Sequence, residues 1–162
     1  MRMLAGRPLI AYPLDALGAV CPRVVVVAKR DTELPGGVER WDEPLAPRHP
    51  LTGIVHALEC AGGAVLVCAA DMPFVTPAAC RALIDAPSAD AAVAESGSIL
   101  EPVFGVYRRS ALDRLCAAPP DAALRDVLAG LDLVRVPLPA DVLRGVDTPD
   151  ELSAAERELS DR

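Results

Sequence analysis

Two short runs of apolar residues constrain the fold of this chain more than any other feature of its sequence. They read VVVV at 24–27 and VLVC at 65–68, within the segments 23–28 and 64–70. Each run is short and rich in valine, so each is predicted to be a strand. Neither run alternates apolar with polar residues, which indicates a strand covered on both faces. Strands of this kind are typical of a parallel sheet between two layers of helices.

The rest of the chain alternates between helical and extended periodicity. Helices are expected at 8–17, 51–60, 77–85, 110–117, 122–131 and from 148 onward. Further strands are expected at 91–94, 102–107 and 133–136, and a proline-rich loop at 43–50. This alternation predicts a three-layer α/β fold on a mostly parallel sheet, with residues 1–162 forming a single domain.

Three of the expected helices begin with residues that cap helix ends. Thr76 precedes Pro77, and Ser110 is placed to cap the helix that follows it. Thr148 is followed by a proline and then by Glu151 three residues after the cap. This spacing predicts a capping box, in which the Thr and Glu side chains bind each other's backbone amides.

Composition and charge argue against several classes of protein. The chain has 16 Lys and Arg against 23 Asp and Glu, a net charge of -7, which disfavours general nucleic-acid binding. Its apolar runs are far shorter than the roughly 20 residues that cross a bilayer. The chain opens with no basic and apolar leader, so a cytoplasmic location is expected. The five cysteines lack metal-binding spacing and are expected to be reduced core residues.

An acidic residue, Asp71, follows the second apolar run and stands before Met72 and Pro73. In open α/β sheets, ligands bind beyond the carboxyl ends of the strands. Asp71 is therefore predicted to lie at the edge where a site would form. The alternative is that its side chain only caps a nearby turn.

Four segments around these positions resemble motifs of one enzyme family. They read RHPLTGI at 48–54, AADMPFV at 69–75, LEPVFGVY at 100–107 and GVDTPDEL at 145–152. In this order they resemble the molybdenum cofactor guanylyltransferases, which belong to the Rossmann-like nucleotidyltransferases. The segment RPLI at 7–10 is similar to a helix start of the same family. Each motif is weak alone, but four in order are strong, and the resemblance extends over nearly the whole chain.

The resemblance implies a Mg²⁺ site made by two acids. Asp71 matches the family acid that binds the magnesium ion on the nucleotide, and Asp147 matches an Asn or Asp that helps to hold the metal. Both are hard oxygen ligands, of which Mg²⁺ usually takes one or two from the protein. For Asp147 the alternative is turn chemistry ahead of the Thr148 cap.

The resemblance also implies contacts to the two substrates, GTP and molybdopterin cofactor. Asp42, eight residues before Pro50, matches an acid of the guanine nucleotide site, with a solvated loop acid as the alternative. Three residues match a turn near the nucleotide, in which the glycine would serve close approach or a positive φ: Leu51, Thr52 and Gly53. Glu101 and Arg125 match positions on the pterin side.

The implied reaction transfers GMP from GTP to the phosphate of molybdopterin and releases pyrophosphate. The attacking phosphate is already ionised at neutral pH, so catalysis would rest on positioning and on charge neutralisation by Mg²⁺. Two alternatives remain open. One is another nucleotidyltransferase of this fold that uses CTP or a sugar phosphate. The other is a non-catalytic remnant that binds a partner through an exposed sheet edge.

The start of the chain departs from the family pattern. The family opens with a buried strand and a glycine-rich loop that carries a lysine, whereas this sequence begins MRMLAGRPL and so starts at a later family segment. The first strand, the loop and its lysine are therefore expected to be missing. A gap is then expected beside residues 24–27, and Lys29 is not expected to replace the missing lysine. His49 and Val27 also depart from the pattern, so base specificity stays open.

Overall fold

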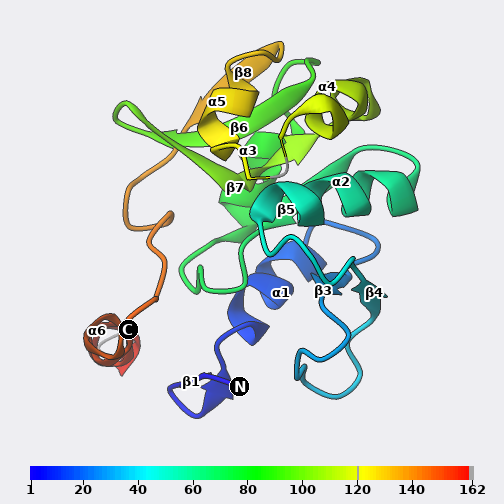
Figure 1. Cartoon of the computed structure of the whole chain (residues 1–162). Coiled ribbons are helices and arrows are strands. Elements are labelled where there is room, and N and C mark those ends of the chain that lie inside the picture. The colour runs from blue at the N-terminus through cyan, green and yellow to red at the C-terminus, as the bar shows by residue number, and fades with distance from the viewer. Residues whose placement is uncertain (120, 161–162) are drawn as a thin grey trace.

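The computed structural model describes residues 1–119 and 121–160, and Figure 1 shows the path of the chain. Its helices are α1 (Ala11–Gly18), α2 (Pro50–Ala61), α3 (Pro77–Ile84), the short 3-10 turn η1 (Arg109–Ala111), α4 (Leu112–Ala117), α5 (Leu124–Leu128) and α6 (Pro149–Ser160). Its strands are β1 (Met3–Leu4), β2 (Arg7–Pro8), β3 (Val26–Ala28), β4 (Arg40–Asp42), β5 (Val65–Cys68), β6 (Ala91–Ser96), β7 (Ile99–Tyr107) and β8 (Leu133–Pro137). None of these helices combines the length and the apolar character that crossing a bilayer requires.

The strands form a four-stranded sheet and two separate pairs. The large sheet has the order β5-β7-β6-β8, in which β7 runs antiparallel to both neighbours and β6 runs parallel to β8. Strands β5, β6 and β8 therefore share one direction. A second pair, β3 and β4, is parallel, and β1 and β2 form an antiparallel hairpin.

Helix α2 sets the direction of β5 relative to β3. The helix begins beside the carboxyl ends of β3 and β4, since a Cβ at Gly53 would lie 3.5 Å from Glu43 Oε2 and 4.0 Å from Val27 Cγ1. It then leads through Gly62 and Gly63 to the amino end of β5. Strands β3, β4 and β5 consequently point the same way, so five of the strands β3 to β8 share one direction and the mostly parallel sheet is confirmed.

Helices cover both faces of the sheet, which confirms the three-layer α/β fold. On one face, residues of α2, α4 and α5 pack with Tyr107 in one hydrophobic cluster. On the other face, α1 and α3 pack with Phe104 in a second cluster. Along β6, Ala91 and Val93 belong to the first cluster and Ala92 to the second. This alternation has the period of two that a strand buried on both faces requires.

The pairing of β6 with β7 depends on one glycine. A Cβ at Gly105 would lie 2.8 Å from the Ala92 carbonyl oxygen and 3.2 Å from Val93 Cα. Both of these neighbours are backbone atoms that cannot move aside. The pairing register shifts between Val93 and Ala94, directly after this close approach.

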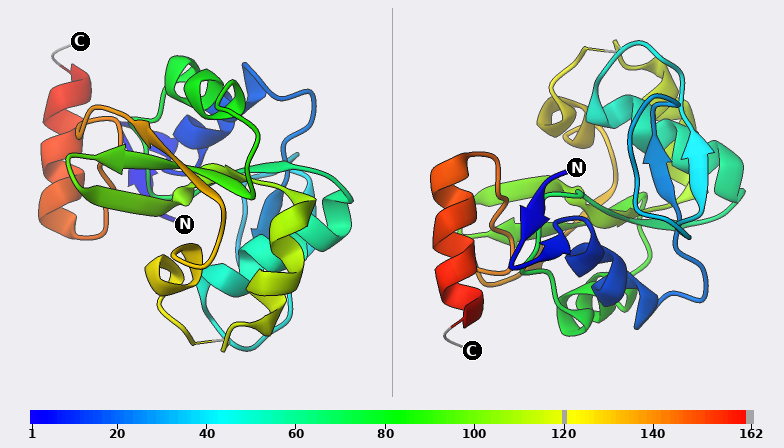
Figure 2. Two further views of the ribbon diagram at one scale, coloured as in Figure 1. Left: turned by 90° about the horizontal axis from the view of Figure 1, so that it is seen from above. Right: turned by 90° about the horizontal axis from the view of Figure 1, so that it is seen from below.

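A third hydrophobic cluster joins the two ends of the chain. Its buried members come from the β1–β2 hairpin, the segment after β5, the segment before α6, and α6 itself: Leu4, Leu9, Phe74, Val146 and Ala155. Figure 2 shows the hairpin and α6 lying side by side, and β1 contacts α6. The cluster therefore connects the carboxyl edge of β5 to the C-terminal helix.

The expected gap beside residues 24–27 is present. Strands β3 and β5 do not pair with each other, and each has its only described partner on its other side. Between them lies a cavity of about 780 Å³ lined by Val24 to Val27 and by Ala64 to Ala70. All four residues of β5 are only half-buried, although the strand lies beside the hydrophobic core.

Several expected element boundaries were wrong. Pro8 lies in β2 rather than in a helix, because Ala5 and Gly6 adopt positive φ values of 47° and 76° and turn the chain into a hairpin. Strand β4 lies where none was expected, and α5 is shorter than the helix expected at 122–131. Ser110 does not cap a helix, since α4 is preceded by a 3-10 turn that contains it.

The other two caps are confirmed. The Ala79 amide donates to Thr76 Oγ1 at 3.2 Å. The Glu151 amide donates to Thr148 Oγ1 at 3.2 Å, and the Thr148 amide donates to Glu151 Oε2 at 2.9 Å, which completes the capping box.

The open edges of β3 and β5 predict that an added strand stabilises the fold. A chain extended before Met1 by residues that include an apolar strand of about five residues should melt at a higher temperature, because that strand can pair with both edges. For a domain of this size each kcal/mol raises Tm by about 2–4 °C. A matched extension with prolines inside the strand cannot donate backbone hydrogen bonds and should give no increase. Equal Tm values for all three proteins would contradict the prediction.

Candidate functional site

Two acids from distant parts of the sequence meet at the carboxyl edge of β5. The Val146 amide donates a hydrogen bond of 2.8 Å to the Asp71 carbonyl oxygen, which brings Asp147 beside Asp71. Gly145 lies close to both acids. A Cβ added there would be 3.9 Å from the Asp71 carbonyl oxygen and 4.0 Å from Asp147 Oδ2. Asp71 is half-buried and Asp147 is exposed. The structure therefore brings together the two residues expected to form a metal site.

The electrostatics of this pair favour a bound cation. Burial raises the pKa of Asp71, and the neighbouring Asp147 carboxylate raises it further. A backbone hydrogen bond and the positive charge of Arg2 act in the opposite direction. Two close carboxylates repel each other when both are ionised, and a divalent cation removes that repulsion. The donor set, two hard carboxylates, fits Mg²⁺.

No third ligand side chain joins the pair. Within residues 1–119 and 121–160, no group of three or more His, Cys, Asp or Glu side chains is arranged to hold a metal ion. A cation at Asp71 and Asp147 would therefore take its remaining ligands from water or from a substrate. This is the usual arrangement for Mg²⁺ that is bound together with phosphates.

Glu101 lies within electrostatic reach of both Asp71 and Arg125. Glu101 is a half-buried residue of β7, and burial raises the pKa of its carboxyl group. A backbone hydrogen bond from Val103 and the charge of Arg125 lower that pKa, whereas Asp71 raises it. Arg125 is thus connected to Asp71 through Glu101, which interacts with both.

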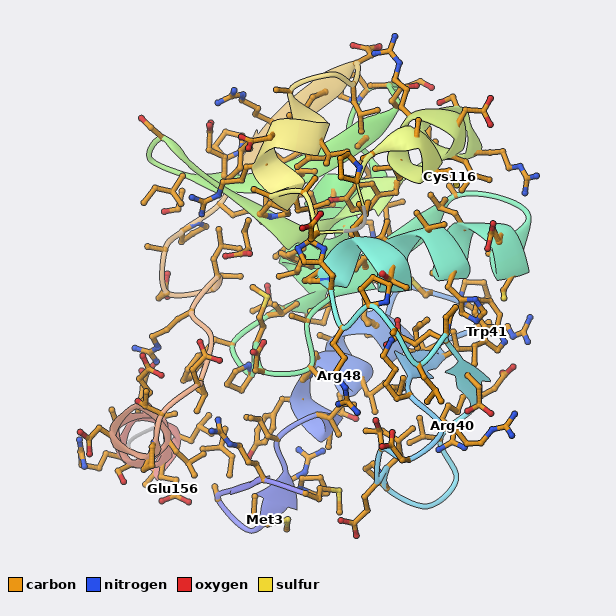
Figure 3. All side chains as sticks on the ribbon, in the orientation of Figure 1. Met3, Arg40, Trp41, Arg48, Cys116 and Glu156 are labelled. Atoms are coloured by element: carbon orange, nitrogen blue, oxygen red, sulfur yellow. The ribbon has the colours of Figure 1, made fainter. Side chains whose placement is uncertain are left out.

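Asp42 lies apart from this group. It ends β4, and its carboxylate pairs with Arg30 at 3.3 Å and with Arg40 at 2.8 Å. Figure 3 shows Arg40 and Trp41 at the far side of the molecule from Glu156 on α6. The structure therefore gives Asp42 two arginine partners on the β4 side and no described contact with Asp71.

The next residue, Glu43, faces the interior instead. Its Oε1 lies 3.3 Å from Lys29 Nζ, and the two side chains are only 14% and 6% exposed. Lys29 also donates hydrogen bonds to the carbonyl oxygens of Pro44 and Pro47. Sequence reasoning missed Glu43, although a lone lysine directly after a buried strand is a signal that an acidic partner is close.

Residues 51–53 form the first turn of α2 rather than a separate turn. Leu51 is 3% exposed and packs in the core, while Thr52 and Gly53 are partly exposed. The Gly53 backbone is helical, so of the two roles expected for this glycine the positive φ is wrong. His49 has extended dihedrals and accepts a hydrogen bond of 3.3 Å from the Leu51 amide at its Nδ1, which makes it the N-cap.

A family model described as the MobA-like NTP transferase domain matches residues 1–136. The chain belongs to this family. Its fold is also that of a solved member, the molybdopterin-guanine dinucleotide biosynthesis protein A from Archaeoglobus fulgidus. That structure has a TM-score of 0.79 and 25% identity, over 99% of this chain and 90% of the other.

The chain is also similar to proteins with other names. The 2-C-methyl-D-erythritol 4-phosphate cytidylyltransferase from Thermus thermophilus has a TM-score of 0.74 and 18% identity, over 98% of this chain and 92% of the other. The bifunctional protein GlmU from Rhodospirillum rubrum is 36% identical over 92 residues, which is 51% of this chain. The match spans only 20% of the length of that curated relative.

The helical backbone at Gly53 predicts that alanine is tolerated there. A Cβ would meet Glu43 Oε2 and Val27 Cγ1 only at ordinary contact distances. Gly53→Ala should therefore raise the free energy of unfolding by about 0.5–1 kcal/mol in urea denaturation. Gly62→Ala is the matched control, because Gly62 ends the same helix with φ 66° and should lose stability as alanine. A loss of stability in Gly53→Ala would contradict the prediction.

The buried Lys29–Glu43 pair predicts a large effect of removing one partner. Lys29→Met should lower the free energy of unfolding by about 3 kcal/mol, because it leaves a buried carboxylate without its counter-charge. The double variant Lys29→Met/Glu43→Gln should recover part of this loss. Arg48→Met is the control, because Arg48 pairs with Asp31 at 3.5 Å on the exposed surface, where such pairs contribute about 0–1 kcal/mol. Equal losses for Lys29→Met and Arg48→Met would refute this assignment.

Proposed function

We propose that this chain is a molybdenum cofactor guanylyltransferase that transfers GMP from GTP to molybdopterin and uses Mg²⁺ held by Asp71 and Asp147. The observation that carries the proposal is the meeting of these two carboxylates at the carboxyl edge of β5, fixed by the hydrogen bond from the Val146 amide to the Asp71 carbonyl. The name of the structural relative from Archaeoglobus fulgidus supports the choice of substrates. A cytoplasmic location is part of the same proposal.

The Asp71–Asp147 pair has two tasks in this proposal. The carboxylates bind the cation that accompanies the nucleotide phosphates, and they fix its position relative to the sheet. When bound there, Mg²⁺ supplies charge neutralisation for the phosphates and the leaving pyrophosphate. Since the acceptor phosphate is ionised at neutral pH, the protein needs no strong general base, and its work is to hold the two substrates in line.

Other residues serve the two substrates. Thr52 and Gly53, partly exposed at the start of α2, lie near the nucleotide, and Leu51 supports them from the core. Asp42 belongs to the nucleotide side only if GTP reaches its pairs with Arg30 and Arg40. On the acceptor side, Arg125, whose charge acts on Glu101, attracts the phosphate of molybdopterin.

A second candidate uses CTP instead of GTP. It is favoured by the fold similarity to the cytidylyltransferase from Thermus thermophilus, which covers 98% of this chain. It is also favoured by Val27, an apolar residue lining the cavity at a place where some guanylyltransferases carry an asparagine. The two candidates differ in the base that the protein recognises, so nucleotide binding distinguishes them.

Nucleotide selectivity is tested by thermal melting. With Mg²⁺ present, GTP should raise Tm more than ATP or CTP does, because a ligand that binds only the folded state stabilises it. At a concentration of about 100 Kd the stabilisation is about 2.7 kcal/mol. A larger shift with CTP would replace the guanylyl assignment with the cytidylyl one. No shift with any nucleotide, in this chain and in a chain extended by a pairing strand, would favour the non-catalytic alternative.

Catalysis is tested by pyrophosphate release from GTP in the presence of molybdopterin. Asp71→Asn should abolish release without unfolding the protein, because the half-buried side chain lies past the strand end and its replacement opens no core cavity. Asp147→Asn should reduce the rate less, since water and phosphate oxygens share its role. Asp113→Asn, an exposed acid on α4, is the matched control and should be unchanged. Wild-type turnover by Asp71→Asn would remove the mechanism.

A further inference from the structure

The backbone on either side of Asp147 is bound by three different parts of the chain. The Val146 amide donates to the Asp71 carbonyl at 2.8 Å. Glu151 Oε2 accepts from the Asp147 amide at 2.8 Å and from the Thr148 amide at 2.9 Å. The guanidinium group of Arg2 donates to the Val146 carbonyl at 2.8 Å and to the Asp147 carbonyl. Both polar backbone groups of Asp147 are therefore held, and its carboxylate lies beside Asp71.

Arg2 is suited to this task by its shape. A guanidinium group is planar and carries several N–H donors in a fixed arrangement, so it can bind two successive carbonyl oxygens at once. An ammonium group is a point charge on a flexible stem and fixes no such geometry. Both hydrogen bonds are charge-assisted and are therefore stronger than those between neutral groups.

The segment that carries Arg2 is itself anchored. Leu4, two residues later, is 0% exposed and packs with Val146 and Ala155 in the third hydrophobic cluster. The Tyr12 hydroxyl donates to the Leu4 carbonyl at 2.9 Å. Figures 2 and 3 show the hairpin around Met3 next to α6, which carries Glu156. Arg2 therefore connects a fixed hairpin to the segment 145–148.

Arg2 can affect a cation bound at Asp71 and Asp147 in two opposite ways. A guanidinium near the carboxylates repels a divalent cation and weakens its binding. A guanidinium that fixes the backbone of Asp147 keeps both carboxylates at the separation a shared cation needs, and so strengthens binding. The hydrogen bonds of Arg2 go to the carbonyls of Val146 and Asp147 rather than to the carboxylates, which favours the second effect.

We propose that Arg2 is a positioning residue that holds Asp147 in register with Asp71 and thereby increases the affinity of this pair for a divalent cation. The inference rests on the metal role assigned to the two acids. It adds a residue from the opposite end of the chain that acts through the backbone and touches neither the metal nor the substrate.

The sign of the effect on metal affinity is the first test. Mn²⁺ binding is titrated by its electron paramagnetic resonance signal on the full chain without nucleotide, for the wild type, Arg2→Ala and Arg2→Lys. Arg2→Ala should bind Mn²⁺ about 10-fold more weakly, the lower end of the effect of residues that orient metal ligands. Arg2→Lys should lie between the two. Arg7→Ala is the matched control, because Arg7 is an exposed arginine of the same hairpin that pairs with Asp15 at 2.7 Å, and it should bind like wild type.

Amide hydrogen exchange provides a readout that needs no metal. Exchange at the Val146 and Asp147 amides should accelerate in Arg2→Ala and stay unchanged in Arg7→Ala, while both variants keep the wild-type exchange in β6 and β7. Unchanged exchange at Val146 and Asp147 would overturn the positioning role. Accelerated exchange throughout the sheet in Arg2→Ala would also overturn it, since that pattern reports general destabilisation.

The possible results separate this inference from the proposed function. A wild-type protein that binds no Mn²⁺ would refute the metal site, and this inference with it. A wild type that binds Mn²⁺ and an Arg2→Ala variant that binds it equally well, or more tightly, would overturn the role of Arg2 alone and leave the metal assignment intact.

Discussion

The hydrogen bond from the Val146 amide to the Asp71 carbonyl is the contact on which the rest of the site depends. It connects the end of β5 to a segment that follows the last strand of the sheet. The third hydrophobic cluster surrounds the same contact with Phe74, Val146 and Ala155, so the polar contact and the apolar packing support each other. Burial and the neighbouring Asp147 carboxylate both raise the pKa of Asp71 here, and a cation bound at this edge would relieve the repulsion between the two acids.

The local elements of the fold could be predicted from the sequence because local rules decide them. The two apolar runs formed β3 and β5, and the caps at Thr76 and Thr148 started their helices as expected. Elements stabilised by distant partners could not be predicted this way. Strand β4 has only three residues and exists because it pairs with β3, and the β1–β2 hairpin is held by Leu4 in a cluster with α6. The residues of β4 do not reveal its pairing with β3, and the residues of the hairpin do not reveal its packing against α6.

The residues of the candidate site were also only partly predictable from the sequence. Asp71 was expected at the strand end from sheet geometry, and Asp147 came from the resemblance; the structure brings the two together. Asp42 and Glu43 are neighbours in an extended segment, so their side chains point to opposite sides. One meets Arg30 and Arg40 on the surface, and the other meets Lys29 inside. Sequence alone does not say which of two adjacent acids faces in, because that depends on how β4 pairs with β3.

The open edges of β3 and β5 link the stability of the sheet to the chemistry of the site. Strands β3 and β5 point the same way, and the cavity between them is lined by Ala69 and Ala70, the residues just before Asp71. A strand that pairs in parallel with both edges must therefore end beside Asp71, and the residues after it must enter the site. The ammonium of Lys29 is already engaged by Glu43 and by the carbonyls of Pro44 and Pro47. An added strand of this kind would therefore affect both the stability of the sheet and the surroundings of Asp71.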